Sequence, residues 1–285
     1  MEGNFKEEFL GTLVFILILA NVYLWQFIFS LDGNLKVVFF DIGQGDSAFI
    51  ETPQGHQILI DGGPNDRILT KLGRAMPFWD KTIDLVIASH PDYDHLGGLV
   101  DVLERYKVKN VLWNGIMVDS KVFTDFQASL EKENAQVFTA QSGQVIKAGV
   151  ARFFVLYPLI DLAGQFTETE TNNTSVVARL DYGDSDFLFT GDLPIKSENE
   201  LLATGQDVGA DVLKVGHHGS KYSTSKEFLA AVSPRLAIIS CGANNRYGHP
   251  NQEVLSNLQE FAINVKRTDQ LGDIKVVSNG KNLIY

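Results

Sequence analysis

The chain contains one cysteine, Cys241, and this excludes an internal disulfide. Cys241 follows a short apolar run, residues 236–240, so we expect it to be a small buried hydrophobe.

After residue 35 the sequence has no internal repeat and no linker rich in proline, glycine or serine. A chain of 285 residues with 45% hydrophobic side chains is long enough for one large domain, or two small ones, with an ample core.

Basic residues are scarce: 24 Lys and Arg stand against 35 Asp and Glu, and the net charge is −11. Spread evenly, this charge would repel a polyanion. The segment Val212–Tyr285, however, carries nine Lys and Arg against five Asp and Glu, a local charge of +4, which leaves −15 on the rest. Two interpretations stay open: chance variation of a solvated surface, and an attractive patch near an active site.

Charged side chains are absent from residues 9–31. As a helix this segment is long enough to cross a hydrocarbon core about 30 Å thick, so we predict a single transmembrane helix preceded by a short tail, residues 1–8. A cleaved signal peptide and a buried core helix are the alternatives. Lys6 and Lys36 on the two flanks do not distinguish the orientation.

Four potential metal ligands lie within six positions directly after a short apolar β-forming run, residues 83–88: His90, Asp92, Asp94 and His95. Side chains in a loop at the end of a strand can converge on one point. Imidazole with carboxylate suits a divalent first-row metal, so His90 and Asp92 can serve one ion while Asp94 and His95 serve a second. The alternative is an ordinary polar loop.

Other apolar strands end in the same way. Asp192 follows the run 187–189, His217 and His218 follow 212–215, and Asp61 follows 57–60. Helical and β-forming segments alternate from residue 82 onward, which predicts a layered α/β or α+β domain whose sheets are covered by helices. The turn 43–46, Gly-Gln-Gly-Asp, lacks the length and lysine of a phosphate-binding loop and is interpreted as a tight hairpin turn; the alternative is that Gln44 and Asp46 reach the site.

These motifs together resemble a known family. Asp61-Gly62-Gly63, the histidine and aspartate cluster, Thr190-Gly191-Asp192 and the segment 216–220 (Gly-His-His-Gly-Ser) resemble the metallo-β-lactamase fold of metal-dependent hydrolases. With the segments 41–46 and 247–250, the likeness narrows to the C-terminal hydrolase domain of the ComEC family of competence DNA-uptake proteins. The resemblance implies a four-layer αβ/βα sandwich, and we expect this hydrolase domain over residues 35–285.

The resemblance also implies ligand roles. His90 and Asp92 would hold one metal ion, Asp192 would bridge, and the second ion would take Asp94, His95 and His217. Asp61 would not bind a metal but would accept a hydrogen bond from a ligand imidazole and hold that ring in place. The chain has no histidine between His95 and His217, where most of the superfamily has one; Asn173 stands near that position, as a weak ligand, a substrate contact or a loop residue. More oxygen ligands make Mn²⁺ or Mg²⁺ credible beside Zn²⁺, with a slight preference for Mn²⁺.

For the reaction, two divalent ions can acidify a water and clamp a phosphodiester. We assign Asp94, His218 and His249 to catalysis, and Asn173, Ser220 and Lys221 to substrate contacts. The resemblance implies a membrane-anchored phosphodiesterase or nuclease acting on single-stranded DNA, with an extracytoplasmic catalytic domain and a separate uptake channel as partner. Two alternatives stay open: a hydrolase of a small ester, lactone or β-lactam, and a non-catalytic DNA- or partner-binding module with a degenerate metal site.

Overall fold

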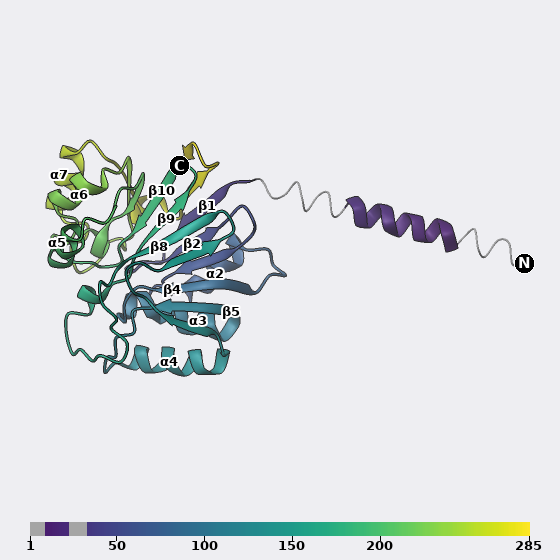
Figure 1. The fold of residues 1–285 in the computed structure, drawn as a ribbon, viewed down its shortest axis with the longest axis horizontal. Helices are drawn as coiled ribbons and strands as arrows, with labels where there is room; N and C mark the ends of the chain where they lie inside the picture. The colour runs from purple at the N-terminus through teal and green to yellow at the C-terminus, as the bar shows by residue number, and fades with distance from the viewer. Residues whose placement is uncertain (1–8, 23–32) are drawn as a thin grey trace, which may run out of the picture.

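The computed structural model describes residues 9–22 and 33–285, and two β-sheets packed face to face form its centre (Figure 1). The first sheet has the strand order β15–β14–β1–β2–β3–β4–β5–β6. Its strands are β1 (Leu35–Phe39), β2 (Ala48–Glu51), β3 (Gln57–Ile60), β4 (Thr82–Ala88), β5 (Lys107–Trp113), β6 (Gln136–Thr139), β14 (Ile274–Ser278) and β15 (Leu283–Ile284). The strands β1 to β3 form an antiparallel meander, and β3 to β6 run parallel.

The second sheet has the order β13–β12–β11–β10–β9–β8–β7. Its strands are β7 (Val145–Ala148), β8 (Ala151–Tyr157), β9 (Val177–Tyr182), β10 (Ser185–Phe189), β11 (Val212–Lys214), β12 (Leu236–Ile239) and β13 (Asn264–Arg267). The strands β10 to β13 are parallel to one another. Each sheet therefore has a parallel half, and polar residues that follow neighbouring parallel strands meet at one edge of a sheet.

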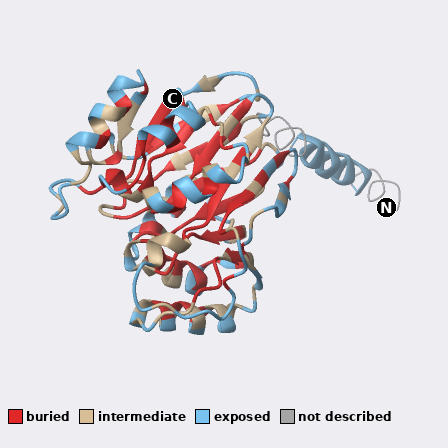
Figure 2. Ribbon diagram, turned by 60° about the vertical axis from the view of Figure 1, so that its left-hand side comes forward, coloured by how far each residue is buried: buried red, intermediate tan, exposed pale blue. Residues whose placement is uncertain are grey.

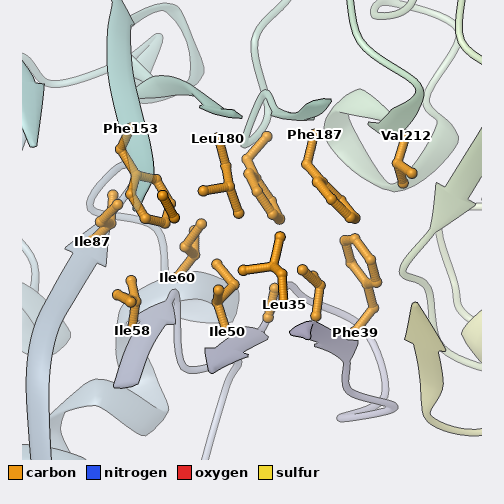
Figure 3. Close-up of a cluster of buried hydrophobic side chains, with 14 of the residues drawn as sticks. Leu35, Phe39, Ile50, Ile58, Ile60, Ile87, Phe153, Leu180, Phe187 and Val212 are labelled. Atoms are coloured by element: carbon orange, nitrogen blue, oxygen red, sulfur yellow. The ribbon is translucent and has the colours of Figure 1, made fainter. Parts of the chain in front are cut away.

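Apolar side chains from the facing sides of the two sheets fill the space between them (Figure 3). In β1 the residues alternate between buried and half-buried, the period of a strand with one face in the core. Phe39 of the first sheet stacks on Phe189 of the second with ring centroids 5.9 Å apart. This core fixes the separation of the two sheets, and with it the distances across any site that both sheets build.

Helices cover the outer face of each sheet (Figures 1 and 2). The first sheet packs against α2 (Arg67–Ala75), α3 (Tyr93–Arg105) and α4 (Lys121–Glu133), and the second against α5 (Ile195–Ala203), α6 (Lys226–Val232) and α7 (Gln252–Glu260). In α3, Leu96, Leu99 and Leu103 are buried at helical spacing while Glu104 is exposed. The mixed αβ/βα sandwich expected from the motifs is confirmed.

The membrane-spanning helix expected over residues 9–31 is not confirmed. Residues 9–22 are helical, and their side chains, including Phe9, Phe15 and Leu19, are exposed. Residues 1–8 and 23–31 of that expectation lie outside the described residues. No helix in the described part of the chain is both long enough and apolar enough to cross a membrane.

Candidate metal centre

Polar residues from both sheets meet at the edge where the parallel strands end. His90 follows β4, and Asp94 and His95 lie in the first turn of α3. Asp192 follows β10 and is preceded by Gly191, which has a φ of +52°. The absence of a side chain at Gly191 leaves room for Ser89, because a Cβ there would lie 3.0 Å from the Ser89 Cβ. The sandwich thus brings together residues that are far apart in the sequence.

His217 and His218 lie in a short 3-10 segment, η2 (Gly216–Gly219), directly after β11. Both have left-handed backbone, with φ of 49° and 55°. Such a conformation is unfavourable for a residue with a side chain, and it is typical of functional sites that the surrounding fold holds in place. Here it directs the two neighbouring imidazoles differently: His218 is buried, while the His217 side chain is 27% exposed.

Three groups of ligand-type atoms in the described part of the chain include His95, and two of them contain predicted metal ligands besides His95. In the first, His90, His95 and Asp192 each offer an atom within 4.8 Å of the others; in the second, Asp94, His95 and His218 do the same. His95 Nε2 lies 3.4 Å from Asp192 Oδ1. His218 Nε2 lies 3.3 Å from Asp94 Oδ2 and 3.4 Å from Asp192 Oδ2, so Asp192 touches both groups.

Hydrogen bonds behind the imidazoles decide which ring nitrogens face the centre. His95 Nδ1 lies 2.8 Å from the Asp61 Oδ2 atom, and an ionised carboxylate only accepts, so Nδ1 donates. Ser89 Oγ donates to the same Asp61 oxygen at 2.7 Å and can then accept from His90 Nδ1 at 3.0 Å. In both rings the proton sits on Nδ1, and the lone pair of Nε2 is left for a ligand.

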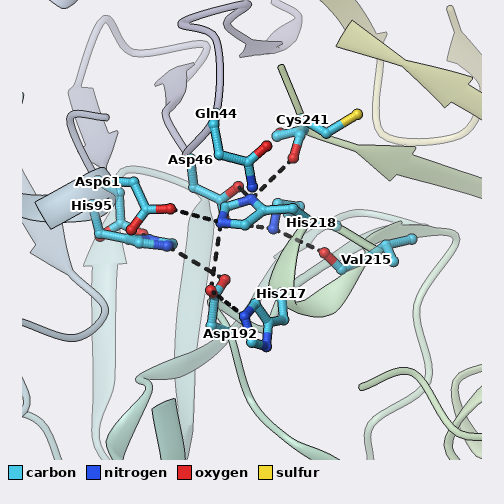
Figure 4. A network of polar contacts seen from close by, with 12 residues as sticks. Gln44, Asp46, Asp61, His95, Asp192, Val215, His217, His218 and Cys241 are labelled. Carbon is cyan, nitrogen blue, oxygen red and sulfur yellow. Dashed lines mark hydrogen bonds and ion pairs between the residues drawn. The ribbon is translucent and has the colours of Figure 1, made fainter. Parts of the chain in front are cut away.

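His218 has the same arrangement on the other side of the site (Figure 4). Its Nδ1 lies 3.0 Å from the backbone oxygen of Ser240 and 3.1 Å from Asp46 Oδ1, both of them acceptors. Asp46 in turn forms an ion pair with the Lys214 ammonium. A buried carboxylate therefore lies beside Nδ1 of each ring: Asp61 accepts a hydrogen bond from His95, whereas Asp46 forms an ion-pair contact with His218, whose Nδ1 hydrogen bond goes to the Ser240 oxygen.

Charge balance is the dominant energetic feature of this cluster. Burial opposes the charge of Asp192, but attraction to His218 and His95 outweighs it and holds the pKa of this carboxyl well below its usual range. Burial likewise opposes protonation of His218, yet Asp192 and Asp46 raise its pKa to about 10. The buried carboxylates therefore stabilise positive charge at this point. Either protonated imidazoles or a divalent cation can supply that charge.

The donor set fits a divalent metal. Within the described residues, Nε2 of His90, of His95 and of His218, and Oδ1 of Asp192, are buried and have no hydrogen-bond partner. Unpaired buried polar atoms are costly, and four of them converging from three elements need a ligand. Three imidazole nitrogens with the carboxylates of Asp94 and Asp192 suit Zn²⁺ or Mn²⁺.

The remaining predicted ligands lie beside these groups. Asp92 Oδ2 is 3.6 Å from His90 Nε2, and its Oδ1 accepts from Thr171 at 2.6 Å. His217 Nε2 is 3.7 Å from Asp192 Oδ2, and His217 belongs to neither group described above. The metal role predicted for His217 and the catalytic role predicted for His218 stay predictions; the distances favour His218 as the ligand.

His249, predicted to be catalytic, and the predicted substrate contacts Ser220 and Lys221 differ in burial and in their nearness to the imidazoles. His249 lies closest, with its ring 5.6 Å from His217, and burial together with repulsion from His218 lowers its pKa to about 4. Ser220 is buried, and Lys221 is exposed with its ammonium over the Tyr222 ring. These roles stay predictions.

The side-chain amide of Asn173 donates to Glu170 at 2.7 Å. The neighbouring Asn172 occupies the nearer position: its Nδ2 lies 3.3 Å from His217 Nδ1. Both belong to a short 3-10 segment, η1 (Thr171–Thr174), inside a stretch without regular strands or long helices. A sequence argument that relies on neighbouring positions cannot choose between two adjacent asparagines in such a segment.

Sequence reasoning assigned no role to Asp46 or Lys214. It interpreted the Gly-Gln-Gly-Asp turn as a hairpin turn, with Gln44 and Asp46 reaching the site only as the alternative; in the structure Asp46 lies against His218. One signal was available: Lys214 stands in an otherwise apolar run that forms a central strand, and a buried lysine requires a partner.

The fold and the centre together define a class: an αβ/βα sandwich with an imidazole and carboxylate metal centre at the edge where the parallel strands end. The chain belongs to the metallo-beta-lactamase superfamily, whose family model matches residues 40–243. Two solved structures share the fold. They are the metallo-beta-lactamase fold protein YhfI from Bacillus subtilis (TM-score 0.55, 12% identity, 88% of this chain and 99% of that one) and Igni18, a metallo hydrolase from Ignicoccus hospitalis (TM-score 0.56, 15% identity, 85% and 98%).

The chain is also similar to curated proteins, as the motifs predicted. It is 36% identical to ComE operon protein 3 of Bacillus subtilis (strain 168) over 264 residues, which are 86% of this chain and 33% of that protein. It is 32% identical to the competence protein ComA of Neisseria gonorrhoeae over 249 residues, 86% of this chain and 32% of that protein. The chain therefore spans about a third of the length of these relatives, and the resemblance to the ComEC family is confirmed.

Proposed function

We propose that this chain is a divalent-metal-dependent phosphodiesterase that cleaves single-stranded DNA. The observation that carries the metal part is the set of four buried, unpartnered atoms on His90, His95, His218 and Asp192. The DNA part is supported by the relatives named as competence proteins and by the resemblance of the motifs to the ComEC hydrolase domain.

Divalent ions bound at such a centre supply Lewis-acid activation of water and of a phosphoryl oxygen. The chain's own residues prepare the place for this chemistry. Hydrogen bonds to Asp61 and to the Ser240 backbone oxygen hold His95 and His218 in place, so the ligands do not need to reorganise during the reaction. His249, whose pKa is lowered to about 4, is neutral at pH 7 and can donate one ring N–H to a phosphate oxygen.

The surface next to the opening supports a nucleic acid as substrate. Tyr222 and Tyr247 are 63% and 53% exposed, and each carries a cation against its ring: the Lys221 ammonium at 5.1 Å and the Arg246 guanidinium at 4.9 Å. Tyr247 also stacks on His249, with ring centroids 5.7 Å apart. Exposed aromatic rings beside positive charge are typical of proteins that hold single strands through their bases and backbone. Both pairs fall in the segment Val212–Tyr285, where the local charge is +4.

We also propose that the exposed apolar helix of residues 9–22 holds the protein at a lipid surface, with the catalytic domain on the extracytoplasmic side. No charged side chain interrupts this helix, and exposed apolar area of this kind partitions into a membrane interface. A separate uptake channel is the proposed partner, because the matched relatives are about three times as long as the segment they share with this chain. Flotation of the full chain with lipid vesicles tests the lipid part: Phe15→Asp with Leu19→Asp is expected to abolish it.

The test of the reaction uses the full chain, freed of metal and then supplied with Mn²⁺, Mg²⁺ or Zn²⁺ and an end-labelled single-stranded oligonucleotide. We expect at least one ion to restore cleavage, and Asp94→Asn to abolish that cleavage while the protein stays folded. A metal-loaded, folded chain that leaves DNA intact but hydrolyses a chromogenic ester, a lactone or a β-lactam would replace the nuclease proposal by the small-substrate alternative. A chain that binds DNA but hydrolyses none of these would favour the binding module.

A further inference from the structure

Two oppositely charged residues are buried behind His218. The side chains of Asp46 and Lys214 are 8% and 5% exposed, and Asp46 Oδ2 forms an ion pair with the Lys214 ammonium. Lys214 also donates to the backbone oxygen of Val215 at 2.8 Å. The other Asp46 oxygen, Oδ1, faces His218 Nδ1 at 3.1 Å. Lysine, aspartate and histidine therefore form a continuous buried chain that ends at the metal centre, and Figure 4 shows Asp46 beside His218 in this chain.

Stability alone does not account for this pair. Removing two charges from water costs about as much as their attraction returns, and well-packed apolar residues of the same volume are often equally stable or more stable. The tautomer of His218 does not require the pair either, because the Ser240 backbone oxygen already accepts from Nδ1 at 3.0 Å. The Asp46 carboxylate adds a negative charge, which makes His218 Nε2 a stronger ligand. Lys214 adds a positive charge, which offsets the cost of burying this carboxylate.

The position of Asp46 is fixed from a second direction. Its backbone N–H donates to the backbone oxygen of Asp94 at 3.2 Å. The close approach needs glycine at the preceding position: Gly45 has φ of +133°, and a Cβ there would lie 2.3 Å from the same Asp94 oxygen. One residue therefore contacts the ligand turn of the first sheet through its backbone and the ligand histidine of the second sheet through its side chain.

We propose that Asp46, charge-compensated by Lys214, is a positioning residue for the metal centre: its negative charge beside His218 Nδ1 strengthens Nε2 as a ligand. Lys214 acts through Asp46 and does not touch the substrate. This proposal rests on the metal part of the function proposed above and is independent of the substrate. It assigns to the Gly-Gln-Gly-Asp turn and to the lysine of β11 a role on the metal-binding side of the site.

The test measures metal binding without any substrate. The full chain, its Asp46→Asn variant and the double variant Asp46→Asn with Lys214→Met are titrated with Mn²⁺, and free Mn²⁺ is followed by electron paramagnetic resonance. We expect Asp46→Asn to weaken one Mn²⁺ site about 10- to 100-fold, as changes behind ligand histidines do. The double variant removes both charges, so we expect its Tm to exceed that of Lys214→Met alone while its Mn²⁺ affinity stays as weak as that of Asp46→Asn.

A matched control is Asp181→Asn, which breaks the ion pair of Asp181 with Arg179 (2.8 Å) outside the metal centre and should leave Mn²⁺ affinity unchanged. Wild-type Mn²⁺ affinity in Asp46→Asn overturns the proposal. Should Asp46→Asn not fold, the double variant carries the measurement, and wild-type affinity there overturns it equally. A chain whose Mn²⁺ affinity responds as expected but which leaves DNA intact removes the nuclease proposal and leaves this one standing.

Discussion

His218 Nε2 lies 3.3 Å from Asp94 Oδ2, although His218 follows a strand of the second sheet and Asp94 begins a helix that follows a strand of the first. The contact joins the two halves of the sandwich at their shared edge. A cation bound between them should therefore stabilise the whole domain, because it binds the folded chain and has no comparable site in the unfolded one.

The first prediction follows from this linkage. A free Mn²⁺ concentration 100 times Kd should add about 2.7 kcal/mol of stability per ion, which raises Tm by roughly 5–10 °C in a domain of this size. Asp192→Asn should lose most of that rise, because Asp192 touches both ligand groups. Thermal unfolding with and without Mn²⁺ measures it, with Asp184→Asn, at an exposed turn position, as the control. An equal rise in Asp192→Asn would contradict the assignment of the centre.

The second prediction separates the two neighbouring histidines. His218→Gln should lower the amount of metal retained after dialysis, because His218 Nε2 lies within 3.4 Å of two carboxylates. His217→Gln should retain more, since its ring lies farther from the carboxylate that it faces, with His217 Nε2 3.7 Å from Asp192 Oδ2. Elemental analysis of the two variants gives the answer. The opposite order of retention would restore the role that sequence reasoning gave to His217.

The third prediction concerns DNA. Tyr247→Ala should weaken binding of a single-stranded oligonucleotide by about 1–3 kcal/mol, the usual contribution of one stacked base, whereas Tyr247→Phe keeps the ring and should bind as the wild type does. Fluorescence anisotropy with a labelled oligonucleotide measures both. Trp79→Ala is the control, because Trp79 is an aromatic residue of similar exposure (69%). It precedes β4, whereas His90 of the metal centre follows β4, so the two lie at opposite ends of this strand. Equal losses in Tyr247→Ala and Trp79→Ala would mean that the ring plays no specific part.

The fourth prediction concerns stability and pH away from the centre. Burial, together with repulsion from Asp181 and Asp211, raises the pKa of Asp186 to about 6. The folded chain then holds a proton that the unfolded chain has lost above about pH 4, so stability falls as the pH rises from about 4 to 6. Asp186→Asn removes this loss and should raise the free energy of unfolding at pH 7 by roughly 1–2 kcal/mol, after allowance for screening.

Urea unfolding of wild type and Asp186→Asn at pH 4.5 and pH 7 tests the fourth prediction. The gain from the substitution should be present at pH 7 and small at pH 4.5, where the wild-type carboxyl is already protonated. A gain of the same size at both pH values would point to a cause other than ionisation.

Local sequence patterns were sufficient for most of the secondary structure. The strand β3 begins and ends with the apolar run 57–60, β10 contains the run 187–189, and β11 and β12 lie within the runs 212–215 and 236–240. β14 (Ile274–Ser278) was not predicted, although Ile274 and Val276 alternate with the exposed Lys275. β7 and β15 were not predicted either. Both are short, and β15 is defined by its pairing with β14. Strands of this kind depend on partners elsewhere in the chain, which a local pattern does not contain.

In the candidate site too, local features could be predicted and features that depend on distant parts of the chain could not. The ligand types and their positions after strands could be inferred from sequence because each motif is local. The choice between His217 and His218 could not, because it depends on two left-handed residues that the surrounding fold imposes. The role of Asp46 could not either, since Lys214 and His218 reach it only when the two sheets are packed together.

The pairing of β1 with β14 has a consequence for how the domain is made. Leu35 lies opposite Ser278 in this ladder, so the first strand of the first sheet gains its second neighbour only when nearly the whole chain has left the ribosome. Until then one edge of β1 exposes unpaired backbone groups, and such an edge can pair with another chain. Synthesis of this domain therefore passes through a stage prone to aggregation, and circular permutants that join β14 directly to β1 should shorten that stage.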